Sequence, residues 1–166
     1  MKSIGTLAIA QRRQDEWKAL ELQRRFAQQY PHLFDAHDLT LALGAQGRKG
    51  YHFVEWLGAI VLHLATGYNA LVSKYQYSKH SAKRQVIRSL GLSDLVRQRH
   101  PVYGNAQGPD LLMYRADLTD YFFCEIKGPD DALRNAQPAY FEHLERETGR
   151  PVQLLRFKWA RGRAGA

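Results

Sequence analysis

One short segment constrains the fold of this chain more than any other: the apolar run FFCEIK at residues 122–127, which a Gly-Pro pair ends. Successive side chains of a β-strand point to opposite faces of the sheet, so alternate residues share a face. Glu125 and Lys127 would therefore project together as a carboxylate and an ammonium group. Such a pair is either an ion pair or half of a catalytic site. The opposite, core-like face would hold Phe122, Cys124 and Ile126.

A second strand-like run precedes this one, because DLLMY and YFFCEIK flank the turn RADLTD. Pairing Tyr114 with Tyr121 predicts an antiparallel hairpin, and the same register sets Asp110 opposite Glu125. Two carboxylates held together repel each other unless a cation lies between them. A hard divalent ion such as Mg²⁺ prefers oxygen ligands of this kind. Lys127 would then orient or deprotonate a water, or neutralise charge on a phosphate, as metal-assisted phosphodiester hydrolysis requires.

Length and composition are typical of a globular protein. The 166 residues are 45% hydrophobic, which is enough for a real core. No apolar run approaches the roughly 20 residues of a membrane span, and the apolar patch at the N-terminus is shorter than a signal core. We therefore expect a cytoplasmic protein without membrane attachment. The single cysteine, Cys124, excludes an internal disulfide and a multi-cysteine zinc site, and we interpret it as a buried core residue.

The charge is strongly positive and unevenly distributed. The net charge is +8, and between residues 39 and 108 the only acids are Glu55 and Asp94. This basic span favours a polyanionic partner such as nucleic acid, and a merely solvated basic face is the alternative. Tyrosines interleave with the cations and could stack on bases or be partly buried. The expected nucleic-acid-binding residues are Lys74, Lys79, Lys83, Arg84 and Arg88.

Periodicity and breaker residues predict the remaining elements. Helices are expected at residues 12–30, 35–44, 51–66, from about Ser78 or Ser81 to Leu90, and at 131–148. The segment GAQGRKG is expected to be a flexible loop, NALVSKYQY a strand or a connector, and PVQLLRF a final strand. Asp130 and Asp131 are expected to start the last helix, as its cap and first-turn acid.

The residues quoted so far resemble a known family. GPDLLMY at 108–114, followed by EIKGPDDALRNAQ at 125–137, is similar to the VRR-NUC branch of the PD-(D/E)XK nuclease superfamily, to which the Fanconi-associated nuclease and small phage nucleases belong. The resemblance lies in Pro-Asp, fourteen intervening residues, and Glu-x-Lys-Gly-Pro with a Leu and a Gln downstream. It covers residues 108–157 well, 51–67 loosely and 1–50 not at all.

The resemblance implies an α/β restriction-endonuclease-like fold, a mixed sheet flanked by helices, with a nuclease domain at 51–160. Residues 1–50, which the resemblance does not cover, are expected from their periodicity to form a helical N-terminal extension. It implies a Mg²⁺- or Mn²⁺-dependent deoxyribonuclease in which Lys127 assists the attacking water. Its metal ligands would be Asp110, Glu125, the backbone carbonyl of Ile126 and, on an upstream helix, Glu55. Gln137 would lie near the scissile phosphate.

Several alternatives stay open. Glu55 could simply favour a helix start, Gln137 could be an ordinary polar helix position, and His52 could approach the site or lie on the surface or in the core. The substrate would be DNA, with RNA as an alternative. The protein could instead be an antibacterial DNase toxin with an immunity partner, or a nucleic-acid-binding protein without catalysis. The sequence does not separate endonuclease from exonuclease, the preferred DNA structure, a repair, phage or toxin role, or a monomer from a homodimer.

The helix expected at residues 12–30 carries apolar residues on two adjoining faces. Leu22, Phe26 and Tyr30 lie on one face, and Trp17 and Leu20 on the other. Burying such surface is favourable by roughly 25 cal/mol per Å². We expect these residues to pack on the chain's own nuclease domain, with dimerisation as the alternative.

Overall fold

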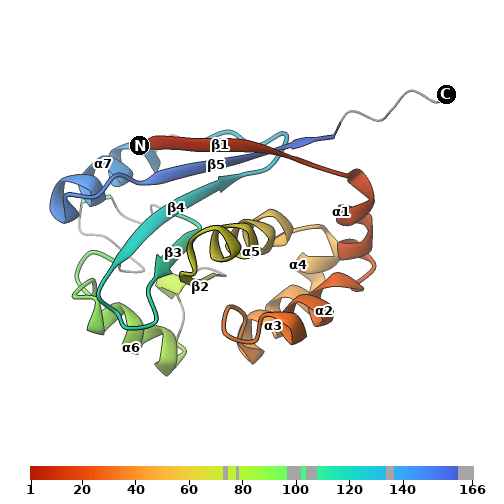
Figure 1. Ribbon diagram of the computed structural model, residues 1–166, viewed down its shortest axis with the longest axis horizontal. Coiled ribbons are helices and arrows are strands. Elements are labelled where there is room, and N and C mark those ends of the chain that lie inside the picture. Colours follow the sequence, from red (N-terminus) through yellow and green to blue (C-terminus); the bar gives the residue numbers. More distant parts are fainter. Residues whose placement is uncertain (73–74, 78, 97–101, 104–107, 134–136, 161–166) are drawn as a thin grey trace.

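The structure is a computed structural model that describes residues 1–72, 75–77, 79–96, 102–103, 108–133 and 137–160. Five strands form one mixed sheet in the order β1-β5-β4-β3-β2 (Figure 1). The strands are β1 Lys2–Ile9, β2 Asn69–Leu71, β3 Leu111–Tyr114, β4 Tyr121–Lys127 and β5 Gln153–Trp159. The helices are α1 Gln11–Lys18, α2 Leu22–Gln29, α3 Ala36–Leu43, α4 Ala45–Arg48, α5 Phe53–Thr66, α6 Ser81–Ser89 and α7 Gln137–Thr148, with a 3₁₀ turn at Tyr75–Tyr77.

The predicted α/β fold is confirmed: a mixed sheet is flanked by helices, and a helical region lies near the N-terminus. The predicted hairpin register is also confirmed, because Tyr114 pairs with Tyr121 and Leu111 with Cys124 in antiparallel β3 and β4. Strand β5 runs parallel to β4, and β1 runs parallel to β5. In the described ranges, no helix is long and apolar enough to cross a bilayer.

The first strand was not predicted. Residues 2–9 pair along β5 from Lys2–Gln153 to Ile9–Trp159 and form the edge of the sheet. Seven of the eight residues of β1 are exposed or half-buried, so the strand shows no alternation of buried and exposed residues. The expectation of a helical extension at residues 1–50 is therefore wrong for residues 2–9, which form a strand.

The long helix expected at residues 12–30 is two helices, α1 and α2. Leu20 lies between them with φ 65°, a left-handed conformation that a leucine rarely adopts and that a continuous helix cannot contain. The segment GAQGRKG is also not a plain loop, because residues 45–48 form α4. Helices α3 and α5 lie where they were predicted, and α5 ends at Gly67, whose positive φ of 75° closes the helix.

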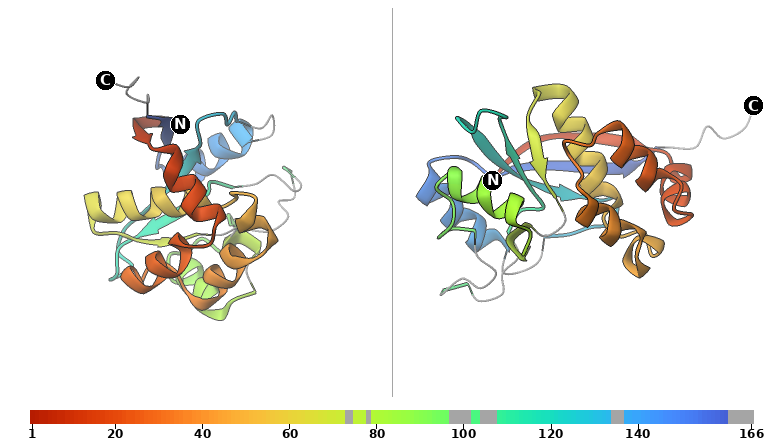
Figure 2. Two further views of the ribbon diagram at one scale, coloured as in Figure 1. Left: turned by 90° about the vertical axis from the view of Figure 1, so that its right-hand side faces the viewer. Right: turned by 90° about the horizontal axis from the view of Figure 1, so that it is seen from below.

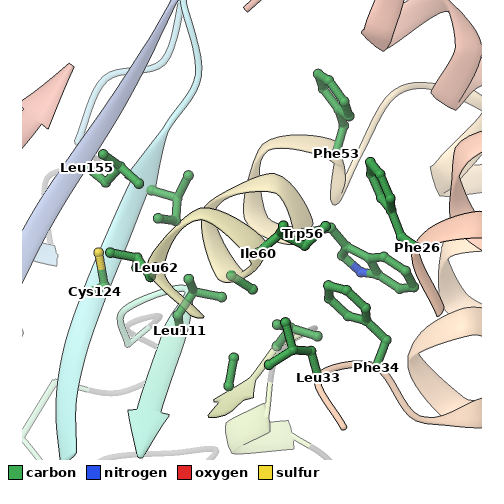
Figure 3. Packing of buried hydrophobic residues seen from close by; sticks show 14 of the residues in the cluster. Phe26, Leu33, Phe34, Phe53, Trp56, Ile60, Leu62, Leu111, Cys124 and Leu155 are labelled. Atoms are coloured by element: carbon green, nitrogen blue, oxygen red, sulfur yellow. The ribbon is translucent and has the colours of Figure 1, made fainter. Parts of the chain in front are cut away.

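Helix α5 lies between the sheet and the N-terminal helices (Figures 1 and 2). One side of it packs on the sheet so closely that a Cβ on Gly58 would lie 2.7 Å from Ile126 Cδ1. On the other side, the Trp56 ring stacks on Phe34 (Figure 3), with centroids 3.8 Å apart. The fully buried Trp17 packs edge-on against Trp56, with centroids 5.3 Å apart. The expectation that the N-terminal helices pack on the chain's own domain is thereby confirmed.

The opposite face of the sheet is covered as well. Phe123, which alternates with Cys124 on β4, is buried together with Tyr140 and Phe141 of α7 and Ile87 of α6. Both faces of β4 are therefore shielded from water, and its polar residues are buried with it.

The last helix was predicted to start at residue 131, but in the described chain α7 begins at Gln137. The Asp131 carboxylate instead accepts a hydrogen bond from the Gly128 N–H at 2.9 Å. Asp130 and Asp131 are thus part of the turn after β4, and their predicted role as cap and first-turn acid of α7 is wrong.

Candidate active site

The carboxyl end of β4 opens into a cavity of about 510 Å³. The segment from α4 to α5 lines one side of this cavity, and the start of β3, the end of β4 and the start of α7 line the rest. The lining includes all six residues that the sequence predicts for catalysis or metal binding: Glu55, Asp110, Glu125, Ile126, Lys127 and Gln137. The structure therefore brings the whole predicted constellation to one place, although its chemical roles stay predictions.

The Glu125 carboxylate is the most buried acid of the site, with no exposed surface. Its Oε1 lies 2.6 Å from the Lys127 Nζ and accepts a hydrogen bond from the Gln137 Nε2 at 3.0 Å. Its Oε2 is buried and has no hydrogen-bond partner among the described residues. The predicted neighbourhood of Glu125 and Lys127 is thus confirmed as an ion pair, but that pair engages only one of the two carboxylate oxygens.

Asp110 lies at the start of β3, beside the end of β4. Its Oδ2 accepts a hydrogen bond from the Ile126 N–H at 2.9 Å. The N–H and C=O groups of one strand residue point toward the same neighbour, so the Ile126 carbonyl faces the edge on which Asp110 lies. Asp110, Glu125 and Ile126 line the same cavity, so the residues of the predicted ligand set lie at one place.

The electrostatics of the site disfavour the ionised carboxylates. Burial raises the pKa of Asp110 well above its usual range, and the charges of Glu125 and Glu55 raise it further. Burial also raises the pKa of Glu125, although the hydrogen bond and charge of Lys127 oppose that rise. Acids that share a dry site in this way are stabilised by a cation. Perturbed carboxyl groups that line a cavity are also a general mark of functional sites.

Glu55 lies in the first turn of α5 and lines the same cavity. Its Oε2 is 3.1 Å from His52 Nδ1, and the other ring nitrogen of His52 is 3.2 Å from Gln46 Oε1. His52 is buried and has a left-handed backbone, with φ 68°. The spacing of three residues between His52 and Glu55 could have indicated this contact. Gln46 was missed, because the segment around α4 was expected to be a loop.

These residues fit a hard divalent cation. In the described part of the chain no group of three His, Cys, Asp or Glu side chains could hold a metal ion, so Glu55 does not complete a three-carboxylate cage. Mg²⁺, however, is commonly bound by only one or two carboxylates and keeps several waters. The unpartnered Oε2 of Glu125, the half-buried Asp110 and the Ile126 carbonyl supply such a set. Ligation by Glu55, directly or through a water, stays a prediction.

The expected nucleic-acid-binding residues divide into two groups. Lys79, Arg84 and Arg88 are exposed, and we call these three residues the basic set. Lys83 is instead buried, with 3% of its surface exposed, and its ammonium group donates to the Asp38 carboxylate and to the Val72 carbonyl. The prediction that Lys83 binds phosphate is therefore wrong, because its charge is already paired inside the protein. Lys74 lies outside the described residues.

In the described part of the chain, the tyrosines that interleave with these cations do not form an exposed surface on which bases could stack. Tyr75 is buried with 2% exposure, and its ring belongs to the core cluster shared by α6 and α7. Tyr68 is half-buried and its hydroxyl donates to Asp120. The alternative interpretation of these residues, partial burial, therefore holds for both.

Comparison of the chain with protein-family models, with curated proteins and with solved structures finds no match. The geometry and chemistry of the cavity are therefore the basis for inferring its function.

Proposed function

We propose that this protein is a Mg²⁺- or Mn²⁺-dependent nuclease that hydrolyses phosphodiester bonds in DNA. The main observation in support is that the buried Glu125 carboxylate is only partly hydrogen-bonded. It is fully buried, Lys127 and Gln137 engage one oxygen, and the other oxygen has no partner among the described residues. Buried polar atoms are almost always paired, and an ion pair that served only stability would be expected to satisfy both oxygens.

A bound divalent ion would activate a water and neutralise charge on the phosphate. In the hydrolysis, the water oxygen forms a bond to phosphorus, one ester P–O bond breaks, and a water proton ends on the leaving oxygen. Lys127 Nζ lies 2.6 Å from the Glu125 carboxylate, at the wall of the cavity that would receive the phosphate. From there it can orient the water or neutralise the developing charge on the phosphate oxygens.

Gln137 supports this chemistry through Glu125. Its side-chain amide donates to Glu125 Oε1 from the first residue of α7, so it fixes the orientation of the carboxylate. Such hydrogen bonds to a ligating carboxylate commonly change metal affinity or activity by about 10- to 100-fold. A contact between Gln137 and the scissile phosphate, as the resemblance implies, is a further part of the proposal.

The test is cleavage of radiolabelled or fluorescent DNA by the purified protein, with Mg²⁺ or Mn²⁺ and with EDTA. We expect cleavage that requires the metal. Glu125→Gln, Asp110→Asn and Lys127→Met should each lower the rate by about 100-fold or more, because each removes a group that contacts the reacting centre. Glu142→Gln is the matched control, since Glu142 is an exposed glutamate on α7, and it should cleave normally.

The outcome that contradicts the proposal is a Glu125→Gln protein that cleaves at the wild-type rate. Metal-independent DNA binding by a wild-type protein that never cleaves would favour the non-catalytic alternative instead. Circular dichroism of every variant establishes that a lost activity is not a lost fold.

A further inference from the structure

Two histidines meet at the end of α5 that lies away from the cavity. His32 comes from the turn between α2 and α3, and His63 from the last turn of α5. Their Nε2 atoms are 3.0 Å apart, and their ring centroids are 4.6 Å apart. His32 is exposed and His63 is half-buried, so a small ion could reach the two nitrogens from solvent.

The proton on His63 has a defined position. Its Nδ1 lies 2.8 Å from the Tyr68 carbonyl oxygen, and a carbonyl can only accept, so Nδ1 carries the hydrogen. Neutral His63 therefore presents the bare lone pair of Nε2 toward His32. A histidine that ligates a metal is typically held in this way, with its other ring nitrogen donating to a backbone carbonyl. Tyr30 packs edge-on against both rings, with centroids 6.4 Å away, and limits their rotation.

We propose that His32 and His63 form a binding site for a Zn²⁺-class transition-metal ion, separate from the carboxylate site. With metal–nitrogen distances of 2.0–2.1 Å, nitrogens 3.0 Å apart subtend an angle of about 94° at the ion. Opening the pair by roughly 0.3 Å gives the tetrahedral angle that zinc prefers. Imidazole nitrogen suits zinc, copper and nickel, whereas Mg²⁺ prefers oxygen, so the two sites differ in the ions they select.

The contact between the rings fixes what metal binding would require of His32. Because His63 Nε2 can only accept, the hydrogen of the 3.0 Å contact belongs to His32 Nε2, and an ion would bind once that hydrogen has moved to Nδ1. Partial burial, and then the neighbouring His63, lower the pKa of His32, which disfavours the cationic ring that would exclude a metal ion. No third His, Cys, Asp or Glu joins the pair among the residues that the structure describes, so water would complete the coordination. We therefore expect an open site of modest affinity that binds one ion.

The position of the site indicates what the ion would do. Glu55 and His63 are eight residues apart on one helix, which corresponds to about 12 Å along its axis. An ion on the histidines would thus not take part in hydrolysis. It would tie the turn before α3 to the end of α5. The residues that follow His32 in that turn, Leu33 and Phe34, are buried against α5, so the ion would stabilise the docking of the N-terminal helical region.

The test is isothermal titration of the full-length protein with Zn²⁺, in excess Mg²⁺ to occupy the carboxylate site. We expect the wild type to bind one Zn²⁺ ion that His32→Ala does not bind. His37→Ala is the matched control, because His37 is also exposed and lies nearby on α3, and it should bind like the wild type. Zinc at about 100 times its Kd should raise the Tm of the wild type by roughly 5–10 °C and leave that of His32→Ala unchanged.

The proposal is wrong if His32→Ala binds Zn²⁺ with the wild-type stoichiometry and affinity, which would place the ion elsewhere. It is equally wrong if the wild type binds no Zn²⁺, which would reduce the pair to a hydrogen bond between two neutral rings. His32 is exposed, so its replacement should not unfold the chain, and His32→Gln serves as a second variant. Electron paramagnetic resonance with Cu²⁺ adds a direct readout, since two coupled nitrogens are expected in the wild type and one at most in either variant.

Discussion

The buried ion pair between Lys83 and Asp38 makes a sharp prediction about stability. Lys83 of α6 is 3% exposed and Asp38 of α3 is 1% exposed. The pair therefore links the N-terminal helical region to α6, one of the helices that cover the second face of the sheet. Lys83→Met keeps a long apolar side chain and removes only the charge. It leaves the Asp38 carboxylate buried without a cation, which typically costs about 3–5 kcal/mol. For a chain of this length we expect a Tm about 6–20 °C lower.

The assay is urea denaturation of the wild type and the variant at neutral pH, followed by circular dichroism. Arg84→Met is the matched control, because Arg84 is the next residue of the same helix and is exposed, and its free energy of unfolding should change by less than about 0.5 kcal/mol. The double variant Asp38→Asn/Lys83→Met should be less destabilised than the sum of the two single variants, since the stranded charge is gone. A loss in the free energy of unfolding below about 1 kcal/mol for Lys83→Met, with no coupling to Asp38, would show that the buried carboxylate does not depend on Lys83.

The pH dependence of this variant has a definite sign. Burial raises the pKa of Asp38 above its ordinary value of 3.8, even though Lys83 opposes that rise. A raised pKa in the folded state means that stability is lost as the pH increases through that pKa. Removal of the Lys83 charge raises the pKa of Asp38 further, so the destabilisation by Lys83→Met should be larger at pH 8 than at pH 5.

Three further predictions follow from other sites. Asp110→Asn should increase the free energy of unfolding of the metal-free protein at neutral pH, because the pKa of the Asp110 carboxyl group is raised in the folded state. For the same reason the wild type should become more stable as the pH falls, and urea denaturation in EDTA should show a smaller increase in the variant. Replacing the basic set with alanine should weaken DNA binding and reduce the magnitude of the slope of log K against log salt concentration by roughly 0.7–0.9 for each phosphate that the variant no longer neutralises. Fluorescence anisotropy titrations at several salt concentrations measure this slope, and an unchanged slope would mean that DNA binds elsewhere on the protein. Gly47→Ala should lower the Tm, because the new Cβ would lie 1.7 Å from the Ala42 carbonyl oxygen and α4 must shift; a wild-type melting curve would contradict the packing at this turn.

The hairpin and the placement of Asp110, Glu125 and Lys127 could be predicted from sequence because local rules determine them, whereas the other three cavity residues, Glu55, Ile126 and Gln137, were predicted only from the family resemblance. A turn of fixed length sets the pairing of Tyr114 with Tyr121, and the two-residue period of a strand then decides which side chains share a face. The position of Asp110 beside β4 follows from the same register. The unpartnered Oε2 of Glu125 does not follow from any local rule, because it depends on which donors α7 brings to the carboxylate.

The burial of Lys83 could have been noticed in the sequence. Lys83 lies four residues before Ile87 and three before Val86, so it occupies the apolar stripe of α6 rather than its solvent face. The composition of the segment, which is rich in cations, obscured that position. Its partner Asp38 lies 45 residues away in the chain, and no local pattern indicates such a distant pair.

The N-terminal region was the hardest part to predict, for two physical reasons. Strand β1 is stabilised by its backbone pairing with β5 at an edge, so its side chains carry little amphipathic signal. The break between α1 and α2 rests on a leucine, Leu20, in a left-handed conformation that glycine or asparagine would ordinarily occupy. The helical periodicity of residues 12–30 continues through this break, and tertiary packing of Trp17 against α5 decides the geometry instead.

The proposed nuclease requires that the Glu125 carboxylate and its neighbours hold a divalent ion at the end of β4. The most direct measurement is a crystal structure of the protein with Mn²⁺, with an anomalous difference map to locate the ion. We expect one peak in the cavity, within about 2.0–2.3 Å of carboxylate oxygens of Asp110 and Glu125, and its loss in crystals of Glu125→Gln. A map with no peak between these two carboxylates at saturating Mn²⁺, or an unchanged peak in Glu125→Gln, would show that Glu125 does not hold the ion.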